Sequence, residues 1–238
     1  IFKPILSFLP VQFIIKKSLI IILSSFFLIL FHHIKSFASS NENKIEDYGV
    51  ISIMFHRFDE SKYPSTNIQL DVFKKQLEII EKEKIKFILP SKLKENIFSN
   101  KNERKILLTI DDGLLSFYEN AWPILKSKKI PFILFVNTRE VGSFNYMNWP
   151  QIKELASEDF VEIGNHSHSH EYLVDEQPSF IKADILTSIK IFKKNLGKNS
   201  KFFSYPFGEY SLQFKKIIRD YNFEFAFGQH SGVIDETK

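Results

Sequence analysis

The stretch Leu107-Leu108-Thr109-Ile110-Asp111-Asp112-Gly113 is an apolar strand that ends in two adjacent carboxylates and a glycine. The chain is already turning where a strand ends, so Asp111 and Asp112 can both be aimed at one pocket. Two like charges side by side are unfavourable unless a cation or a shared proton relieves them. The stretch therefore indicates a metal site with one ligand and one base, although alone it is equally typical of an Asp-Gly turn.

Outward from this strand, short apolar runs alternate with segments of helical periodicity. The predicted strands are residues 50–55, 87–89, 106–110, 132–136, 160–163, 202–205 and 223–227. The predicted helices are residues 71–84 with Asp71 as N-cap, 116–128, 149–157, 179–196 closed by Gly197, and 212–221. Such alternation predicts a parallel sheet, and seven units in one α/β domain favour a barrel over an open sheet.

Barrels carry their chemistry at the C-terminal ends of their strands, and the polar residues of this chain fall there. In strand order they are His56, Asp111 with Asp112, Asn137, the histidines of residues 166–170, the turn 205–208, and Gln229 with His230.

The segment His166-Ser167-His168-Ser169-His170 is a second candidate for metal binding. His166 and His170 are four residues apart, a spacing at which a tight loop brings two imidazoles to the same side while His168 points elsewhere. With Asp112 they form a two-histidine, one-carboxylate set that leaves metal positions open for water and substrate. The chain has no cysteine, so thiolate sites are excluded. The alternative is a histidine-rich surface loop.

The first forty residues have the layout of an export signal. Lys16 and Lys17 precede an apolar run over residues 19–31, and small residues follow at 36–38. The run is short for a membrane span, which needs about 20 apolar residues, but an uncleaved anchor remains an alternative. We expect residues 1–40 to be this leader and residues 41–238 to be the catalytic domain. The domain would be periplasmic, secreted or anchored to the outer face of the inner membrane.

The distribution of charged residues gives one further expectation, and the two ends of the sequence give another. Lysine and arginine exceed aspartate and glutamate by 32 to 28 only because the leader carries four lysines and no acid. The remainder is neutral, which gives no argument for nucleic acid as a partner. Because the chain begins with Ile1 rather than methionine and ends without an obvious stop signal, we also expect a fragment at both ends, with the catalytic domain truncated at its C-terminus.

Three motifs resemble those of the polysaccharide deacetylases, carbohydrate esterase family 4. They are TIDDG at residues 109–113, HSHSH at 166–170 and FSYPFG at 203–208. The segment MFHRF at 54–58, with YPST at 63–66, is similar to the branch that contains poly-N-acetylglucosamine deacetylases, a type close to peptidoglycan and chitin deacetylases. The resemblance covers roughly residues 50–238 and implies a distorted (β/α)7 barrel.

The resemblance also implies roles for individual residues. Asp112, His166 and His170 would bind a divalent metal, most often zinc in this family, with cobalt and nickel as alternatives. Asp111 would be the general base that activates a metal-bound water. In many relatives an arginine stands where this chain has Ser204, so the group that orients Asp111 is missing or comes from elsewhere.

The substrate side of the implied site is less well defined by sequence. His56, Tyr205, Pro206 and Phe207 would line the groove, with the backbone N–H of Phe207 supporting the oxyanion. The general acid would be His230, which follows the third motif, with His56 as its rival.

These inferences predict an exported, metal-dependent deacetylase that removes N-acetyl groups from a β-linked amino-sugar polymer. One alternative is an esterase that removes O-acetyl groups from a xylan-type polysaccharide. Two others are a non-catalytic glycan-binding relative and a membrane-anchored structural protein. Only the leader supports the second of these.

Overall fold

The computed structural model describes residues 49–98 and 103–234, which fall within one compact unit, Asp47–Lys238. The expected leader of residues 1–40 lies outside the described residues, and so does the question of a membrane anchor. Within these two ranges, no helix is both long enough and apolar enough to cross a bilayer.

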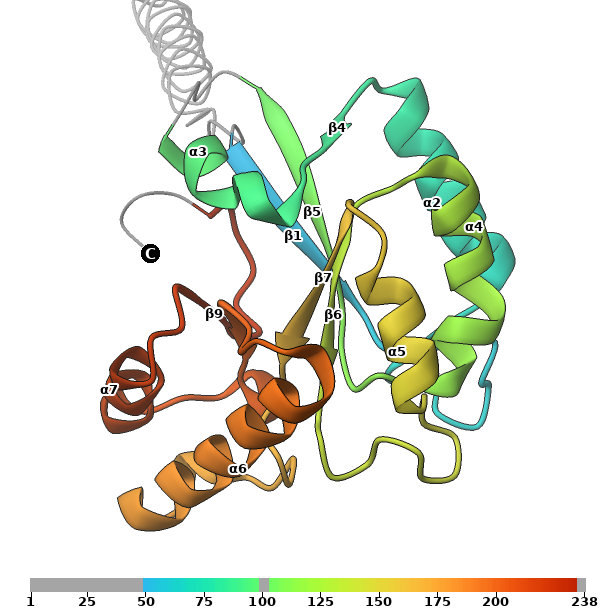
Figure 1. Cartoon of the computed structure of the whole chain (residues 1–238). Coiled ribbons are helices and arrows are strands. Elements are labelled where there is room, and N and C mark those ends of the chain that lie inside the picture. Colours follow the sequence, from blue (N-terminus) through green and yellow to red (C-terminus); the bar gives the residue numbers. More distant parts are fainter. Residues whose placement is uncertain (1–48, 99–102, 235–238) are drawn as a thin grey trace, which may run out of the picture. The chain divides into compact units, whose positions relative to one another are not determined.

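Seven strands form a single curled sheet in the described part of the chain, and every strand pairing in it is parallel (Figure 1). The order is β1-β5-β6-β7-β8-β9, with β4 paired to β5. The strands are β1 Gly49–Phe55, β4 Lys86–Phe87, β5 Arg104–Ile110, β6 Phe132–Val136, β7 Val161–Asn165, β8 Phe202–Ser204 and β9 Phe225–Phe227. These match the seven predicted strands, and the distorted (β/α)7 barrel is confirmed.

Strand β5, which carries the Asp pair at its end, has neighbours along its whole length. Strand β1 pairs with all of β5, β4 pairs with its first half, and β6 pairs with its second half. A strand held in this way has a well-defined end, so the direction of the residues that follow it is fixed.

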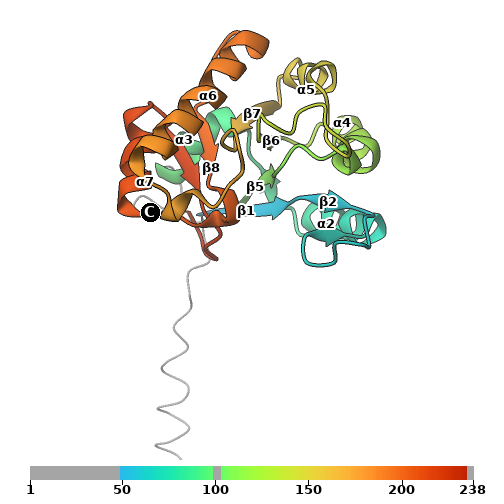
Figure 2. The same cartoon turned by 90° about the horizontal axis from the view of Figure 1, so that it is seen from below.

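The helices lie around the outside of the sheet, α2, α4 and α5 on one side and α6 and α7 on the other (Figure 2). Their bounds are α2 Leu70–Lys82, α3 Leu93–Phe98, α4 Trp122–Lys128, α5 Trp149–Ala156, α6 Pro178–Leu196 and α7 Leu212–Asp220. Gly197 ends α6 at φ 75°, as predicted. The predicted helix 116–128 is divided into a π-helical turn, Phe117–Ala121, and α4, because Pro123 in the first turn of α4 has no N–H to donate backwards.

The start of α2 differs from the prediction, so the assignment of Asp71 as N-cap was wrong. Helix α2 begins at Leu70, with Gln69 as N-cap. The backbone N–H of Leu70 donates to Asp59 Oδ1 at 2.7 Å, so a residue from a preceding loop satisfies the helix start. Asp71 lies in the first turn, where its charge favours the helix dipole.

Three short elements were not predicted from sequence. They are α3 and the two strands of a small separate sheet, β2 Arg57–Phe58 and β3 Asn67–Ile68. A two-residue strand is too short to show a period, and helix α3 is only a turn and a half long.

The core has apolar side chains on both faces of the central strands. On one face, Leu108 of β5 and Leu134 of β6 pack with Trp122 beneath α2, α4 and α5. On the other face, Leu107 and Phe135 pack in a cluster with residues of β1, β8 and α3. Helices α6 and α7 cover β8 through a third cluster. Burial on both faces explains why these strands read as continuous apolar runs.

The segment after β9, residues 228–234, returns to the start of β1, and we call it the closing segment. Ile234 forms an antiparallel bridge with Val50, and its N–H donates to the Val50 carbonyl at 2.8 Å. Gly49 adopts φ 125°, and a Cβ built on it would lie 2.5 Å from Val233 Cγ1. Close approach of this segment to the start of β1 therefore requires glycine at position 49.

Candidate metal centre and active site

The turn after β5 brings the two adjacent carboxylates to the same imidazole. The N–H of Asp111 still donates to the Phe55 carbonyl at 2.8 Å, as a continuation of the sheet. Asp112 then adopts φ 73° and Gly113 φ 69°, a left-handed conformation that aspartate tolerates better than most residues. As a result His166 Nε2 lies 3.9 Å from Asp111 Oδ2 and 3.5 Å from Asp112 Oδ1.

Asp112, His166 and His170 form a cluster that could hold a metal ion. One ligand atom from each lies within 4.8 Å of the others, and His170 Nε2 is 3.3 Å from Asp112 Oδ1. In the described residues, this Oδ1 is buried and has no hydrogen-bond partner. A buried carboxylate oxygen between two imidazole nitrogens, with no donor of its own, fits a cation. One carboxylate and two imidazoles suit zinc and its first-row neighbours.

The main chain fixes the orientation of His166. Its Nδ1 lies 2.8 Å from the Ser204 carbonyl. A carbonyl can only accept, so Nδ1 carries a proton, and Nε2 is the ring nitrogen that faces the two carboxylates. This is the tautomer that a metal ligand requires.

Asp184 of α6 holds the His loop, which we define as residues 166–170. Its Oδ1 accepts from the N–H of His168 at 2.8 Å and its Oδ2 accepts from the N–H of Ser169 at 2.9 Å. The ring of His168 turns to Thr138, with Nδ1 2.9 Å from Oγ1. Thus His168 is kept out of the cluster, and Asp184 is an anchor that the sequence reasoning missed.

A second group of polar contacts shapes the ends of the His loop. Asn165 Oδ1 accepts from the N–H of Ser167 at 2.9 Å, and its amide donates to Ser188 Oγ of α6 at 2.9 Å. Ser167 Oγ accepts from the N–H of His170 at 3.0 Å. Ser167 and His170 both have positive φ, 68° and 53°. These bonds hold a backbone conformation that side chains otherwise disfavour.

Ser204 also orients the proposed base. Its Oγ donates to Asp111 Oδ2 at 2.9 Å, while its carbonyl accepts from His166. Asp111 is 3% exposed, and its Oδ1 is buried without a hydrogen-bond partner in the part of the chain that the structure describes. Ser204 thus occupies the orienting position that the sequence left open.

The carboxylates of the site have opposite pKa shifts. Burial raises the pKa of Asp111 above its ordinary value, against the charges of His166 and His56. Burial acts in the same direction on Asp112, but the imidazole of His166 and the charges of His170 and His56 outweigh it and lower the pKa of Asp112 to about 2. Asp112 is therefore an anion, as a ligand must be, and Asp111 is the more basic of the two.

The two histidines of the cluster also differ. Burial works to lower the pKa of His166, but the neighbouring Asp112 and Asp111 raise it overall. For His170, burial and the charge of His166 lower the pKa to about 4. His170 is therefore neutral at pH 7, with a lone pair available to a cation.

The two histidines considered as general acid lie in different surroundings. His56, half-buried after β1, acts electrostatically on both carboxylates and on His170. His230 is exposed, and its ring packs edge-on against Tyr210 with centroids 5.4 Å apart. His56 is thus near enough to the metal cluster to act on its carboxylates electrostatically, whereas His230 packs against Tyr210, two residues after the third motif.

The third motif presents one aromatic ring to the site and buries the other. Tyr205 is 3% exposed and packs 4.9 Å from the ring of Phe214, and burial raises its pKa. Phe207 is 50% exposed, and its ring lies 4.9 Å from His170. Pro206, which stands between them in the sequence, is buried. Of the predicted groove residues here, only Phe207 offers its side chain to a ligand.

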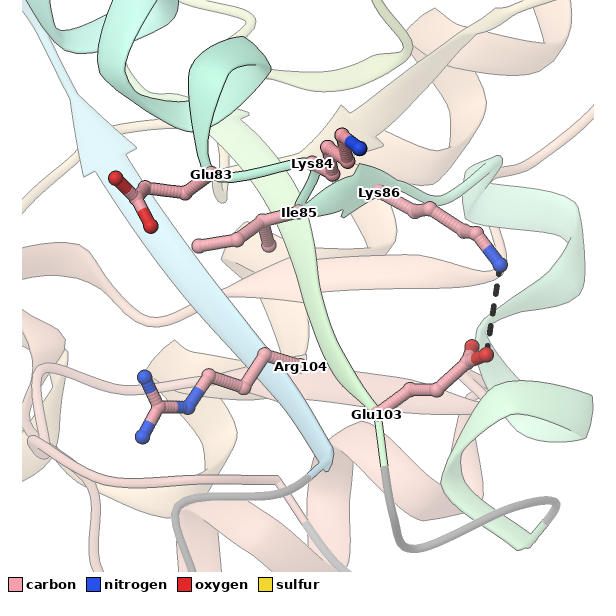
Figure 3. Close-up of a pocket in the computed structure, with 6 residues that line it drawn as sticks. All are labelled: Glu83, Lys84, Ile85, Lys86, Glu103 and Arg104. Carbon is pink, nitrogen blue, oxygen red and sulfur yellow. Dashed lines mark hydrogen bonds and ion pairs between the residues drawn. The ribbon is translucent and has the colours of Figure 1, made fainter.

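A separate pocket of about 310 Å³ lies at the other end of the strands (Figure 3). It is lined by Glu83, Lys84, Ile85, Lys86, Glu103 and Arg104, with Lys86 Nζ 3.5 Å from Glu103 Oε1. These residues precede or begin β4 and β5, whereas the Asp and His residues follow the strands. Oppositely charged side chains satisfy one another there, and no catalytic set is present among its lining residues.

Comparison with known proteins identifies a family for most of the described domain. The family model described as polysaccharide deacetylase matches residues 98–226. Poly-beta-1,6-N-acetyl-D-glucosamine N-deacetylase of Staphylococcus aureus is 26% identical over an alignment of 205 residues, and the match covers 79% of this chain and 70% of that protein.

Solved structures show the same fold. IcaB from Ammonifex degensii superimposes with a TM-score of 0.70 at 23% identity, covering 80% of this chain and 93% of that one. The Streptococcus pyogenes deacetylase PplD, in complex with acetate, has a TM-score of 0.72 at 22% identity, with coverages of 79% and 87%.

Proposed function

Because the chain belongs to the polysaccharide deacetylase family, we propose that it is a metal-dependent hydrolase that removes N-acetyl groups from a β-linked amino-sugar polymer. The observation that carries this proposal is the cluster of Asp112, His166 and His170 with Asp111 beside it. The name of the S. aureus relative, an N-deacetylase of poly-beta-1,6-N-acetyl-D-glucosamine, supports an acetamide as the group attacked.

Asp112, His166 and His170 would hold the metal, for which we propose zinc, with cobalt or nickel as substitutes. A divalent cation at this site supplies Lewis acidity, which polarises the acetyl carbonyl and makes water easier to deprotonate. Three protein ligands leave room for both water and substrate.

Asp111 takes the proton of the attacking water. Ser204 holds Oδ2 of this carboxylate, so Oδ1, which has no partner among the described residues, is free to accept a proton. The raised pKa brings the basicity of Asp111 closer to the pH at which the enzyme works. The backbone N–H of Phe207, at the start of the 3₁₀ turn Pro206–Gly208, supports the oxyanion that follows.

The leaving amine needs a proton, and we assign this step to His56 in preference to His230. His56 acts on both carboxylates and on His170, whereas His230 is exposed and packs on Tyr210. The wider setting is proposed from the leader alone: residues 41–238 act outside the cytoplasm on a polysaccharide, with or without a membrane anchor.

The test compares metal content and acetate release in the wild type, Asp111→Asn and His166→Ala. We expect Asp111→Asn to keep its metal and lose turnover, because it removes the base and no ligand. His166→Ala should lose both. Substrates are N-acetylglucosamine oligomers and acetylxylan, and acetate from acetylxylan alone would assign an O-acetyl esterase.

Asp159→Asn, an exposed carboxylate before β7, is the matched control and should behave as the wild type. Equal turnover in all these proteins, or glycan binding by a metal-loaded wild type that releases no acetate, would refute the proposal.

A further inference from the structure

Two aromatic rings lie exposed beside the metal cluster. Phe207 is 50% exposed and Tyr172 42% exposed, and their ring centroids are 5.7 Å apart at 61°. Phe207 is also 4.9 Å from the ring of His170, so the pair is continuous with the cluster. Large aromatic side chains grouped on a surface next to a site are typical of ligand contact.

Local contacts define the backbone that carries both rings. Phe207 has φ 58°, and the turn around it is closed by the N–H of Gly208, which donates to the Tyr205 carbonyl at 2.8 Å. Tyr172 precedes the 3₁₀ turn Leu173–Asp175, whose Leu173 is 1% exposed. The backbone from which the two rings project is therefore fixed before any ligand arrives, which lowers the entropy lost on binding.

The same surface carries negative charge. The hydroxyl of Tyr172 donates to the carboxylate of exposed Glu209. In the described part of the chain, Glu209 has no ion pair, whereas nearby Glu171 is paired with Arg139 at 3.0 Å. An exposed carboxylate without a basic partner can accept a cationic ligand at little desolvation cost.

We propose that Tyr172, Phe207 and Glu209 form a subsite for a glucosamine unit, a sugar already deacetylated, next to the acetylated unit that reacts. The apolar face of its pyranose ring packs on the two aromatic rings, and its ammonium group pairs with Glu209. This inference rests on the proposed deacetylase function. It means that the product of one turnover is a ligand during the next, so a polymer with some free amines is a better substrate than a fully acetylated one.

The test measures kcat and KM for acetate release from two β-linked pentamers, one fully N-acetylated and one with a single free amine. We expect the wild type to have a kcat/KM about fivefold to tenfold higher on the pentamer with the amine, and this preference to shrink with added salt. Glu209→Gln keeps a hydrogen-bond acceptor for Tyr172 but removes the charge, so the preference should disappear. Tyr172→Ala should raise KM for both pentamers about fivefold, with a smaller change in kcat.

Matched controls carry the same substitutions elsewhere. Phe98→Ala removes a ring that is 60% exposed on α3, and Glu78→Gln neutralises an exposed carboxylate on α2. Both should retain the wild-type preference and KM. The subsite is refuted if the wild type treats the two pentamers alike, if Glu209→Gln retains the preference, or if the controls change as the subsite variants do.

Failure of the subsite and failure of the proposed function can be told apart. If the metal-loaded wild type releases no acetate from either pentamer, the function fails, and the subsite is judged by calorimetric titration with a glucosamine pentamer. Binding that Tyr172→Ala and Glu209→Gln each weaken at least fivefold supports the subsite, and absence of binding overturns it. A dimer that Tyr172→Ala dissociates would assign the rings to a contact between copies and would also overturn it.

Discussion

Ser204 forms hydrogen bonds both to the proposed base and to one of the proposed metal ligands. Its side chain bonds Asp111 and its carbonyl bonds His166, so one residue of β8 sets the position of both. The two contacts are chemically separable, because a substitution removes the hydroxyl and leaves the carbonyl. This separation allows the orientation of the base to be tested without dismantling the metal cluster.

Replacement Ser204→Ala should lower kcat at neutral pH about tenfold, the effect of losing a hydrogen bond to a charged group worth ~1.5 kcal/mol, while metal content stays at the wild-type level. The hydroxyl of Ser204 is one of the groups that lower the pKa of Asp111. Its loss raises that pKa, and because the base must be ionised, the acidic limb of the kcat profile should move to higher pH.

Ser127→Ala, which removes an exposed hydroxyl on α4, is the control for this experiment. An unchanged pH profile in Ser204→Ala would show that this hydroxyl has no part in setting the base. Loss of metal would show instead that the substitution displaced β8.

Helix α6 and the His loop behave as one unit at the scale of elements. Asp184 accepts hydrogen bonds from two backbone N–H groups of the loop, and Ser188 accepts one from Asn165, the residue just before the loop. The loop has no regular structure of its own, so its shape comes from these contacts. The affinity for metal should depend on a helix that provides no ligand.

We expect Asp184→Ala to reduce metal affinity about tenfold to a hundredfold, because groups behind the ligands determine how well they are oriented. It should also lower the free energy of unfolding by ~2–4 kcal/mol, since two N–H groups, one buried and one partly buried, lose their acceptor. Competition with a chelator measures the metal affinity, and urea denaturation measures the free energy of unfolding. Thr187→Ala on the same helix is the control, and equal metal affinity in both variants would contradict the role of Asp184.

Features that depend on neighbouring residues in the sequence could be predicted, whereas contacts between distant residues could not. Buried parallel strands such as β5 and β6 are short apolar runs between turns, so the strands and the family resemblance could be predicted, and both are confirmed. The position of Asp184 opposite the His loop depends on how α6 packs against β8, and no local pattern indicates it. The hydroxyl of Ser204 meets Asp111 across 93 residues of sequence, so its role emerges only in the fold.

At the scale of the whole domain, the closing segment joins the last described residues to the first strand of the sheet. The order of the strands and the return of residues 228–234 to β1 could not be predicted, because alternation gives the class of sheet and not its edges. The segment is short and irregular, and its main backbone contact is the bridge between Ile234 and Val50.

Gly49→Ala tests this closure. The new Cβ would lie 2.5 Å from Val233 in a backbone with φ 125°, so we expect a loss of ~2–3 kcal/mol in the free energy of unfolding. Gly142→Ala is the control, because Gly142 has φ 84° but nothing within 4 Å of a Cβ, and it should cost only ~1 kcal/mol of backbone strain. Equal losses in the two variants would show that contact with the closing segment does not stabilise the domain.

The main-chain anchor of His166 has a consequence for how such a protein can change over generations. A hydrogen bond to a peptide oxygen is present whatever amino acid occupies position 204. Substitution at this position can therefore change the orientation of the carboxylate that accepts the proton, while the histidine that binds the cation keeps its own orientation. Descendants that stop turning over substrate would then still retain their ion, and retained ion would be poor evidence of a working enzyme.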